Sequence, residues 1–240
     1  MITDLKAVLF DLDDTLFDRR KAQKELIQII LEKLPTLFHE RDEETVISAF
    51  LESDEMATQE FTAGLSISLS RTFRFHYFLQ KLELDTSYSQ AIEDLYLQVY
   101  PSVNTPVTDA TAVIEKLAGY FQVGIISNGS PDVQYPKLEK LGISHLLGCV
   151  VLSEEAGIKK PDTGIFRKAI DSLNRRAEEC MYVGDSYQND IIGAKQAGMK
   201  TCWFNPGRLI LSPSDIMPDF QISSLSAIWL HLKCVKVIDA

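Results

Sequence analysis

The amino-acid sequence predicts an α/β fold: a doubly wound, Rossmann-like parallel sheet with an α-helical domain inserted into it. Short, almost continuously apolar runs alternate with segments of helical periodicity, which is typical of buried parallel strands covered by helices. A long stretch after the first run shows helical periodicity alone. We therefore expect an α/β core made of residues 1–16 and 105–240, and an inserted helical domain made of residues 17–104.

Five apolar runs are expected to form the sheet, because strands that are buried on both faces carry apolar residues at successive positions. They are Lys6–Phe10, Gln122–Ser127, Cys149–Leu152, Cys180–Gly184 and Lys200–Phe204. Between the later runs, Ser130 and Pro131 predict the start of a helix that Gly142 ends, and further helical stripes cover Ile165–Leu173 and Ile191–Ala197. In sheets of this kind, ligands bind beyond the carboxyl ends of the strands, where the strand order reverses.

The inserted segment carries apolar residues at helical spacing. One such stripe consists of Tyr88, Ala91, Ile92, Leu95, Tyr96, Val99 and Tyr100, and another of Ala22, Leu26, Ile29, Ile30 and Leu34. Pro101 and Pro106 mark the return to the core. The stretch Glu40–Glu60 holds eight acids, Asp54 among them, and a single base, Arg41, which predicts a solvated helix face.

Composition places the chain among globular proteins and limits its partners. Of its 240 residues, 45% are hydrophobic and 24% are charged. These proportions exclude a disordered chain or a disulfide-stapled miniature scaffold. With 24 Lys+Arg against 34 Asp+Glu, the formal net charge is −10, which disfavours a nucleic acid polymer or an anionic membrane as an electrostatic partner.

Targeting and redox signals indicate a cytoplasmic protein. No window reaches about 18 consecutive apolar residues, and the short run Ala7–Phe10 has acidic residues on both sides, unlike a signal peptide. The four cysteines are widely spaced, so we expect them to be reduced rather than paired or metal-bound: Cys149, Cys180, Cys202 and Cys234.

A pair of carboxylates follows the first apolar run. In Asp11–Thr15 (DLDDT), Asp11 and Asp13 lie two positions apart, so in extended chain their side chains point the same way. At about 4 Å and an effective dielectric constant of about 20, they would repel each other by about 4 kcal/mol. A hard divalent cation removes this repulsion, and oxygen ligands favour magnesium. The alternative is a simple turn, in which aspartate is common.

The second apolar run ends in Ser127, Asn128 and Gly129 before the helix at Pro131. Unpaired backbone N–H groups and the positive end of a helix dipole at such a junction suit a phosphate group. The alternative is an ordinary capped loop between a strand and a helix.

Two lysines, Lys159 and Lys160, precede Pro161 and a helix that begins near Thr163. A lysine at the entry to a helix supplies a positive point charge for a phosphate, although most lysine pairs are only surface charge.

The stretch Gly184–Asp190 (GDSYQND) follows the fourth apolar run. Gly184 lets the backbone turn sharply, and Asp185 is placed to reach the same cation as Asp11. Asp190 is expected at or near the N-cap of the following helix, where it could also hold Lys160 or a metal-bound water.

The order of these four signals resembles that of the haloacid dehalogenase superfamily of phosphohydrolases. The matching stretches are Asp11–Thr15, the Ser127–Asn128 step, Lys160 before Pro161, and Gly184–Asp190. The resemblance spans almost the whole chain, including the position of the helical insert, which looks like that family's cap. The pattern is most similar to the nucleotidase-like and small-metabolite phosphatase branch.

The resemblance implies a role for each matching residue. Asp11 would be the nucleophile that forms an aspartyl-phosphate, and Asp13 would be the general acid and base. Mg²⁺ would be held by the Asp11 carboxylate, the Asp13 backbone carbonyl and Asp185, with Asp190 in support. The substrate phosphate would be bound by Ser127, Asn128 and Lys160.

The function expected from this resemblance is magnesium-dependent hydrolysis of a small phosphorylated metabolite, such as a nucleoside monophosphate or a sugar phosphate. A phosphomutase of a sugar phosphate is the main alternative. A non-catalytic phosphate-ester-binding module and a 2-haloacid dehalogenase are less favoured, since the dehalogenases of the family lack the acid at the position of Asp13. Candidate specificity residues in the insert are Arg19, Arg20, Arg71, Arg74 and His76. The sequence makes no prediction of oligomeric state.

Overall fold

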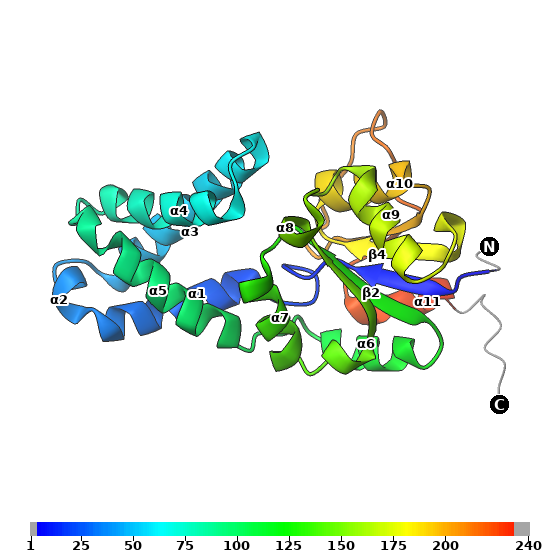
Figure 1. Ribbon diagram of the computed structural model, residues 1–240, viewed down its shortest axis with the longest axis horizontal. Coiled ribbons are helices and arrows are strands. Elements are labelled where there is room, and N and C mark those ends of the chain that lie inside the picture. Colours follow the sequence, from blue (N-terminus) through cyan, green and yellow to red (C-terminus); the bar gives the residue numbers. More distant parts are fainter. Residues whose placement is uncertain (1–3, 233–240) are drawn as a thin grey trace. The chain divides into compact units, whose positions relative to one another are not determined.

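The computed structural model describes residues 4–232, and these divide into two compact units (Figure 1). One unit is Arg19–Asn104, and the other comprises the described residues on either side of it. We refer to them as the helical unit and the core unit. The chain leaves the core unit after Asp18 and re-enters it at Thr105, where the Asp18 backbone N–H donates to the Thr105 carbonyl at 2.7 Å.

A six-stranded sheet in the order β3-β2-β1-β4-β5-β6 forms the centre of the core unit, and all of its neighbouring strands are parallel. The predicted doubly wound α/β fold is therefore confirmed. The strands are β1 (Ala7–Phe10), β2 (Gln122–Ser127), β3 (Leu147–Leu152), β4 (Cys180–Gly184), β5 (Lys200–Phe204) and β6 (Phe220–Ile222).

The central strands match the sequence pattern better than the edge strands. Every residue of β1 and β4 is buried, as continuous apolar runs require. The expectation of a strand buried on both faces is wrong for β3, which begins at Leu147 and is largely half-exposed because it forms an edge of the sheet. β6 was not predicted at all, since three residues are too few to display a period.

Helices cover both faces of this sheet, with α9 and α10 on one side and α6 and α11 on the other (Figure 1). Phe166 and Ile170 of α9 and Ala194 of α10 belong to a buried cluster that includes Leu9 and Tyr182 of the sheet. The helices of this unit are α6 (Ala110–Ala118), α7 (Pro131–Lys140), α8 (Ser153–Ala156), α9 (Thr163–Ser172), the π-helical turn η5 (Tyr187–Ile192), α10 (Gly193–Gln196) and α11 (Ile228–Leu232). Three short 3₁₀ turns accompany them: η3 (Ser144–Leu146), η4 (Ala177–Glu179) and η6 (Leu225–Ala227). Another 3₁₀ turn, η2 (Tyr100–Ser102), lies at the end of the helical unit.

The helical unit is built from apolar helix faces that pack on one another. Phe50 of α3 lies edge-on to Phe78 of α4, with ring centroids 5.5 Å apart, and Phe75 lies 6.2 Å from Phe50. Asp42 caps the N-terminus of α3 by accepting the Thr45 backbone N–H at 2.8 Å. The elements are α1 (Arg19–Lys33), α2 (Pro35–Phe38), α3 (Glu43–Ala63), α4 (Ile67–Lys81), η1 (Thr86–Tyr88) and α5 (Ser89–Val99).

Asp54 corrects the expectation that the acidic stretch Glu40–Glu60 is entirely a solvated face. Its side chain is buried, and its two oxygens lie 2.5 Å from Arg19 Nη2 and 3.1 Å from Arg74 Nε. Burial acts to raise the pKa of Asp54, but the charges of Arg19 and Arg74 lower it to about 2. Two of the candidate specificity residues therefore form an ion-pair cluster inside the helical unit.

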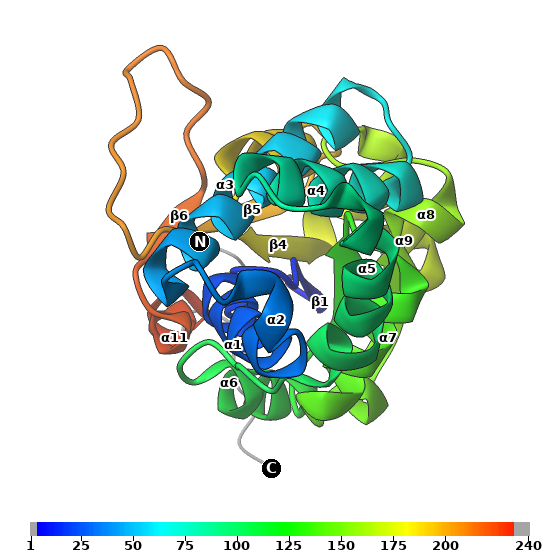
Figure 2. The ribbon, with the colours of Figure 1, turned by 90° about the vertical axis from the view of Figure 1, so that its left-hand side faces the viewer.

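A loop between β5 and β6 projects from the edge of the sheet (Figure 2, orange). It exposes four apolar side chains, those of Leu209, Ile210, Ile216 and Met217. Within residues 4–232, no helix combines the length and the hydropathy that crossing a membrane requires.

Candidate functional site

Two central strands bring the first and last acidic motifs together. Asp11 directly follows β1 and Asp185 directly follows β4, and these strands are parallel neighbours. The Asp11 backbone N–H donates to the Val183 carbonyl at 2.9 Å, which extends the ladder to the first motif. β2 and β4 flank β1, so the connections run to opposite sides of it, and the motifs lie at the point where a doubly wound sheet binds its ligands.

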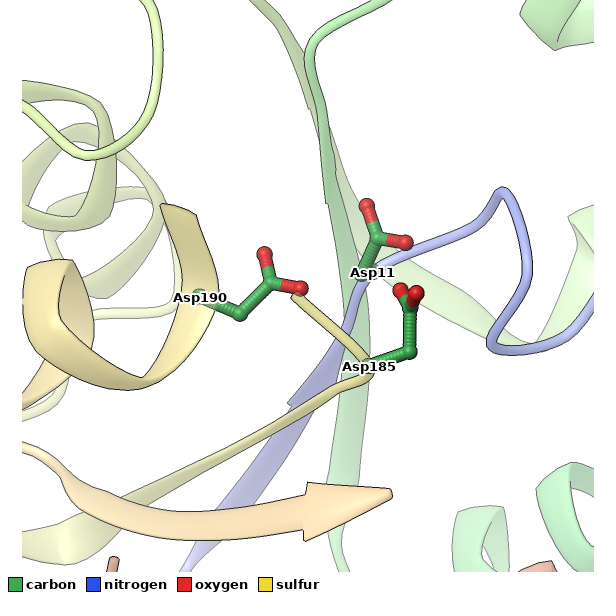
Figure 3. Close-up of side chains that lie close together, drawn as sticks. All are labelled: Asp11, Asp185 and Asp190. Carbon is green, nitrogen blue, oxygen red and sulfur yellow. The ribbon is translucent and has the colours of Figure 1, made fainter. Parts of the chain in front are cut away.

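Three carboxylates form a cluster at this point (Figure 3). Asp11, Asp185 and Asp190 each offer an oxygen within 4.8 Å of the others. Burial raises the pKa of Asp11, although the Lys160 charge opposes this. Burial, together with the charges of Asp190 and Asp14, raises the pKa of Asp185 to about 7. The cluster therefore carries more negative charge than its own surroundings neutralise.

Lys160 is the cation inside this cluster. Its Nζ lies 2.5 Å from Asp11 Oδ1, 2.7 Å from Asp190 Oδ1 and 3.1 Å from the Tyr182 hydroxyl, and the side chain is buried. Burial acts to lower the pKa of Lys160, but the Asp11 and Asp190 charges raise it well above its usual value. Lys160 is thus held as an ammonium group next to Asp11.

The remaining oxygens fit a divalent cation. Lys160 neutralises one charge, whereas three carboxylates contribute three. All of the candidate ligand atoms are hard oxygens, which suit Mg²⁺ better than a thiophilic metal. Asp185 is also oriented, since Thr15 Oγ1 donates to Asp185 Oδ1 at 3.2 Å and accepts from the Asp185 backbone N–H at 3.1 Å. The chemistry of the donor set is thus consistent with a metal held between β1 and β4.

Asn128 fixes the loop that carries Lys160. Its amide donates to the Lys160 carbonyl at 3.0 Å, while its Oδ1 accepts from the Lys160 backbone N–H at 2.7 Å. This reciprocal pair connects the residue after β2 to the loop before α9, across 32 positions of the sequence. The Asn128 side chain therefore supports Lys160, and its backbone N–H is the group expected to contact phosphate.

Asp13 and Ser127 share a hydrogen-bond donor, the side-chain amide of Gln134. Gln134 Nε2 donates to Asp13 Oδ2 at 2.6 Å and to Ser127 Oγ at 2.8 Å. Lys137 Nζ lies 2.5 Å from Asp13 Oδ1. Gln134 and Lys137 come from α7 and were not identified from the sequence. The signal that could have found them is their spacing of three on a helix that starts four residues after Ser127.

The sequence places Asp190 at or near the N-cap of the following helix, but the N-cap is four residues earlier. Ser186 occupies that position, since its Oγ accepts from the Asn189 backbone N–H at 3.3 Å, and Asp190 lies within η5. Asp190 Oδ2 accepts from the Ser186 backbone N–H at 2.9 Å, and Oδ1 contacts Lys160. A side chain at Gly184 would collide with the Asp190 carboxylate, so this approach requires glycine.

Tyr182 is a further residue of the site that sequence reasoning missed. It is completely buried in β4, and its hydroxyl donates to the Ile126 carbonyl at 3.0 Å while lying 3.1 Å from Lys160 Nζ. Within an apolar run, a tyrosine is read as a core residue because its ring is apolar, although its hydroxyl can also take part in a functional site.

Comparisons with known proteins identify a family and several relatives of this chain. The pattern of the haloacid dehalogenase-like hydrolases matches residues 5–198. A glyceraldehyde 3-phosphate phosphatase of Pyrococcus abyssi is 33% identical over 213 residues, which cover 85% of this chain and 83% of that protein. A ribulose-1,5-bisphosphate 5-phosphatase of Halopiger xanaduensis is 32% identical over 206 residues, which cover 83% of this chain and 84% of that protein.

The fold is also shared with a solved structure. The magnesium-bound HAD-hydrolase YfnB from Bacillus subtilis superposes with a TM-score of 0.84, covering 96% of this chain and 100% of that one, at 23% identity. The similarity therefore extends over both the core unit and the helical unit as folds.

Proposed function

Because this chain belongs to the haloacid dehalogenase-like hydrolases, we propose that it is a magnesium-dependent phosphatase that hydrolyses a small phosphate monoester through an aspartyl-phosphate on Asp11. One observation carries the proposal: Asp11 is ion-paired to Lys160 at 2.5 Å, and a second carboxyl group, Asp13, follows two residues later beside Ser127. A nucleophile, a proton donor and fixed cations are the groups that phosphoryl transfer requires.

The first step of the proposed reaction transfers the phosphoryl group to the protein. An oxygen of Asp11 attacks phosphorus in line, the bond from phosphorus to the leaving oxygen breaks, and Asp13 gives its proton to that oxygen. Lys160, the Ser127 hydroxyl and the Asn128 backbone N–H stabilise the charge on the three other oxygens. Ser127 accepts from Gln134, so its single hydroxyl proton is available for the phosphoryl group.

The second step regenerates the protein. Asp13, now ionised, takes a proton from a water molecule whose oxygen attacks phosphorus, and the bond from phosphorus to Asp11 breaks. Inorganic phosphate leaves, and Asp11 returns to its carboxylate form beside Lys160. The carboxyl group of Asp13 favours this hydrolytic outcome over dehalogenation, because dehalogenation needs no acid at this position.

In this proposal the metal ligands are the carboxylates of Asp11 and Asp185 and the backbone carbonyl of Asp13, with Asp190 in support through Lys160. Held by these groups, Mg²⁺ would supply positive charge that lets an anionic nucleophile approach an anionic phosphoryl group. The raised pKa of Asp185, about 7, supports this assignment, since a nearby cation would stabilise the ionised form of such a carboxyl group.

We further propose that residues 17–104 act as a cap that selects the leaving group. The support is their point of insertion, immediately after the stretch Asp11–Thr15. The substrate class is a small phosphorylated metabolite, and the names of the Pyrococcus and Halopiger relatives favour a sugar phosphate over a nucleotide. Three free thiols among the described residues, those of Cys149, Cys180 and Cys202, fit a reducing, cytoplasmic location; Cys234 lies outside the described residues.

The test is turnover of a panel of phosphate monoesters, sugar phosphates and nucleoside monophosphates among them. The wild-type protein is expected to release inorganic phosphate with Mg²⁺, to stop with EDTA and to recover when Mg²⁺ is added back. Asp11→Asn is expected to abolish turnover, whereas Asp171→Asn, an exposed aspartate of α9, serves as the control. Full activity of Asp11→Asn, or an isomerised sugar phosphate as the only product, contradicts the proposal.

A further inference from the structure

Both oxygens of the Asp13 carboxyl group are held by the same helix. Oδ1 lies 2.5 Å from Lys137 Nζ, and Oδ2 accepts from Gln134 Nε2 at 2.6 Å. The two donors are more than 120 positions away in the sequence and three residues apart on α7. Two directed contacts on one planar group fix both its position and its rotation.

Lys137 is buried in a way that a surface lysine is not. Its side chain is 2% exposed, and its Nζ lies 4.4 Å from the centre of the Phe17 ring. Burial of an ammonium group is unfavourable unless charged and hydrogen-bonded partners compensate for it. The Asp13 carboxyl group and the face of the Phe17 ring are such partners, so the ammonium group is held at a fixed place beside Asp13.

Gln134 connects Asp13 to the residue that we place on the substrate phosphate. Its amide nitrogen donates to Asp13 Oδ2 and to Ser127 Oγ, at 2.6 and 2.8 Å. The side chain reaches this position by crossing Gly129, where any Cβ atom would collide with it. The proton-donating group and the phosphate-binding hydroxyl are thus set at a fixed separation by a single amide.

From these contacts we infer that Lys137 and Gln134 are positioning residues that aim the Asp13 carboxyl group at the leaving oxygen of the substrate. This inference rests on the proposed phosphatase function. Each carboxyl oxygen has two lone pairs, so an oxygen that accepts one bond from α7 keeps a second position for the transferred proton. During transfer, the proton moves from Asp13 to the leaving oxygen as its bond to phosphorus breaks and the bond from Asp11 to phosphorus forms.

Esters with different leaving groups can show whether Lys137 and Gln134 position the proton donor or only support the fold. A nitrophenolate departs without protonation, whereas an alkoxide needs a proton in the transition state. The value of kcat/KM reports the steps up to departure of the leaving group, so it separates the two cases even when hydrolysis of the phosphoenzyme limits kcat. If the Asp13 carboxyl group is no longer held in the correct orientation, kcat/KM should therefore fall far more for an alkyl phosphate than for p-nitrophenyl phosphate.

The experiment compares wild-type protein, Lys137→Met and Gln134→Leu on these two esters with saturating Mg²⁺. Methionine keeps an unbranched apolar side chain over Phe17 without the ammonium group. We expect Lys137→Met to lower the ratio of kcat/KM for the alkyl ester to that for the aryl ester by about tenfold to 100-fold, and Gln134→Leu to lower it by about tenfold. Lys140→Met, an exposed lysine of the same helix, should keep the wild-type ratio.

A uniform loss on both esters, or an unchanged ratio in folded variants, overturns the inference. Should Lys137→Met not fold by near-UV circular dichroism, the ratio measured for Gln134→Leu decides. Failure of the proposed function is distinguishable, because it appears as wild-type protein that hydrolyses neither ester, or as Asp11→Asn that hydrolyses both. Active wild-type protein with an inactive Asp11→Asn variant and an unchanged ratio in Lys137→Met rejects only the positioning role.

Discussion

Lys160 Nζ lies 2.5 Å from Asp11 Oδ1, although 149 positions separate the two residues in the sequence. The contact joins the end of β1 to the loop before α9, and Asn128 holds that loop in place. It brings a fixed positive charge to the carboxylate that we propose as nucleophile.

Replacement of Lys160 by methionine should reduce kcat/KM for phosphate monoesters by about 10²–10³-fold, because a preorganised charge that faces the phosphoryl oxygens is lost. Steady-state kinetics at saturating Mg²⁺ measure this effect. Lys168→Met, an exposed lysine of α9, is the matched control. A Lys160→Met variant with near wild-type kcat/KM would falsify the assignment of Lys160 to the phosphate site.

The affinity for Mg²⁺ should depend on pH through Asp185. The pKa of this carboxyl group is raised to about 7 by burial and by the Asp190 and Asp14 charges. A proton and a cation compete for the same oxygen, so the apparent Kd for Mg²⁺ should increase as the pH falls from 8 to 6, by up to about tenfold per pH unit below 7. Isothermal titration calorimetry across this range tests it, and a Kd that does not change with pH is the contrary result.

Asp54 should stabilise the protein in a pH-dependent way. Its pKa of about 2 lies below the usual value, so its contribution is present above about pH 4 and is lost as the pH falls through about 2. At pH 7, Asp54→Asn should lower the free energy of unfolding by about 2 kcal/mol or more, since it also leaves Arg19 and Arg74 without their shared partner.

Urea denaturation at several pH values measures this difference. Glu55→Gln, at the exposed residue next to Asp54, is the control, and it should change the free energy of unfolding by less than about 0.5 kcal/mol. If the loss in Asp54→Asn is as large at pH 2.5 as at pH 7, the ion pair is not its cause.

Gly193 should not tolerate alanine. A Cβ atom there would lie 2.6 Å from Phe166 Cε2 and 2.8 Å from the Pro161 carbonyl oxygen, so α10 and the loop after Lys160 would have to separate. We expect Gly193→Ala to lower the free energy of unfolding by about 1–3 kcal/mol. Gly207→Ala, which meets no atom within 4 Å, should be close to neutral in the same thermal or urea experiment; equal stability of the two variants would argue against the packing described.

The sequence predicted the class of fold and the central strands, and it predicted that the candidate motifs lie together at the carboxyl ends of those strands. β1 and β4 are buried on both faces, so their composition alone identifies them, and parallel strands necessarily bring Asp11 and Asp185 to the same end. The roles given to these residues remain predictions, since they come from family resemblance and not from geometry.

Other residues could not be found because their environment depends on distant partners. Lys137 looks like a surface lysine in the sequence, but its ammonium group is buried against Asp13, 124 residues earlier, and against the ring of Phe17. Asp54 looks like one more acid in a solvated stretch until α1 and α4 supply Arg19 and Arg74. In both cases the neighbouring sequence shows only that the side chain is polar, because tertiary packing determines whether it is buried.

The central claim is that Asp11 carries the phosphoryl group during turnover. It is tested by mixing the protein with Mg²⁺ and a rapidly reacting phosphate ester, quenching in acid within milliseconds, and locating the added phosphoryl mass by peptide mass spectrometry. We predict that the label lies on Asp11 and is absent in Asp11→Asn. Turnover without label on Asp11, or with label on another side chain, would contradict the account.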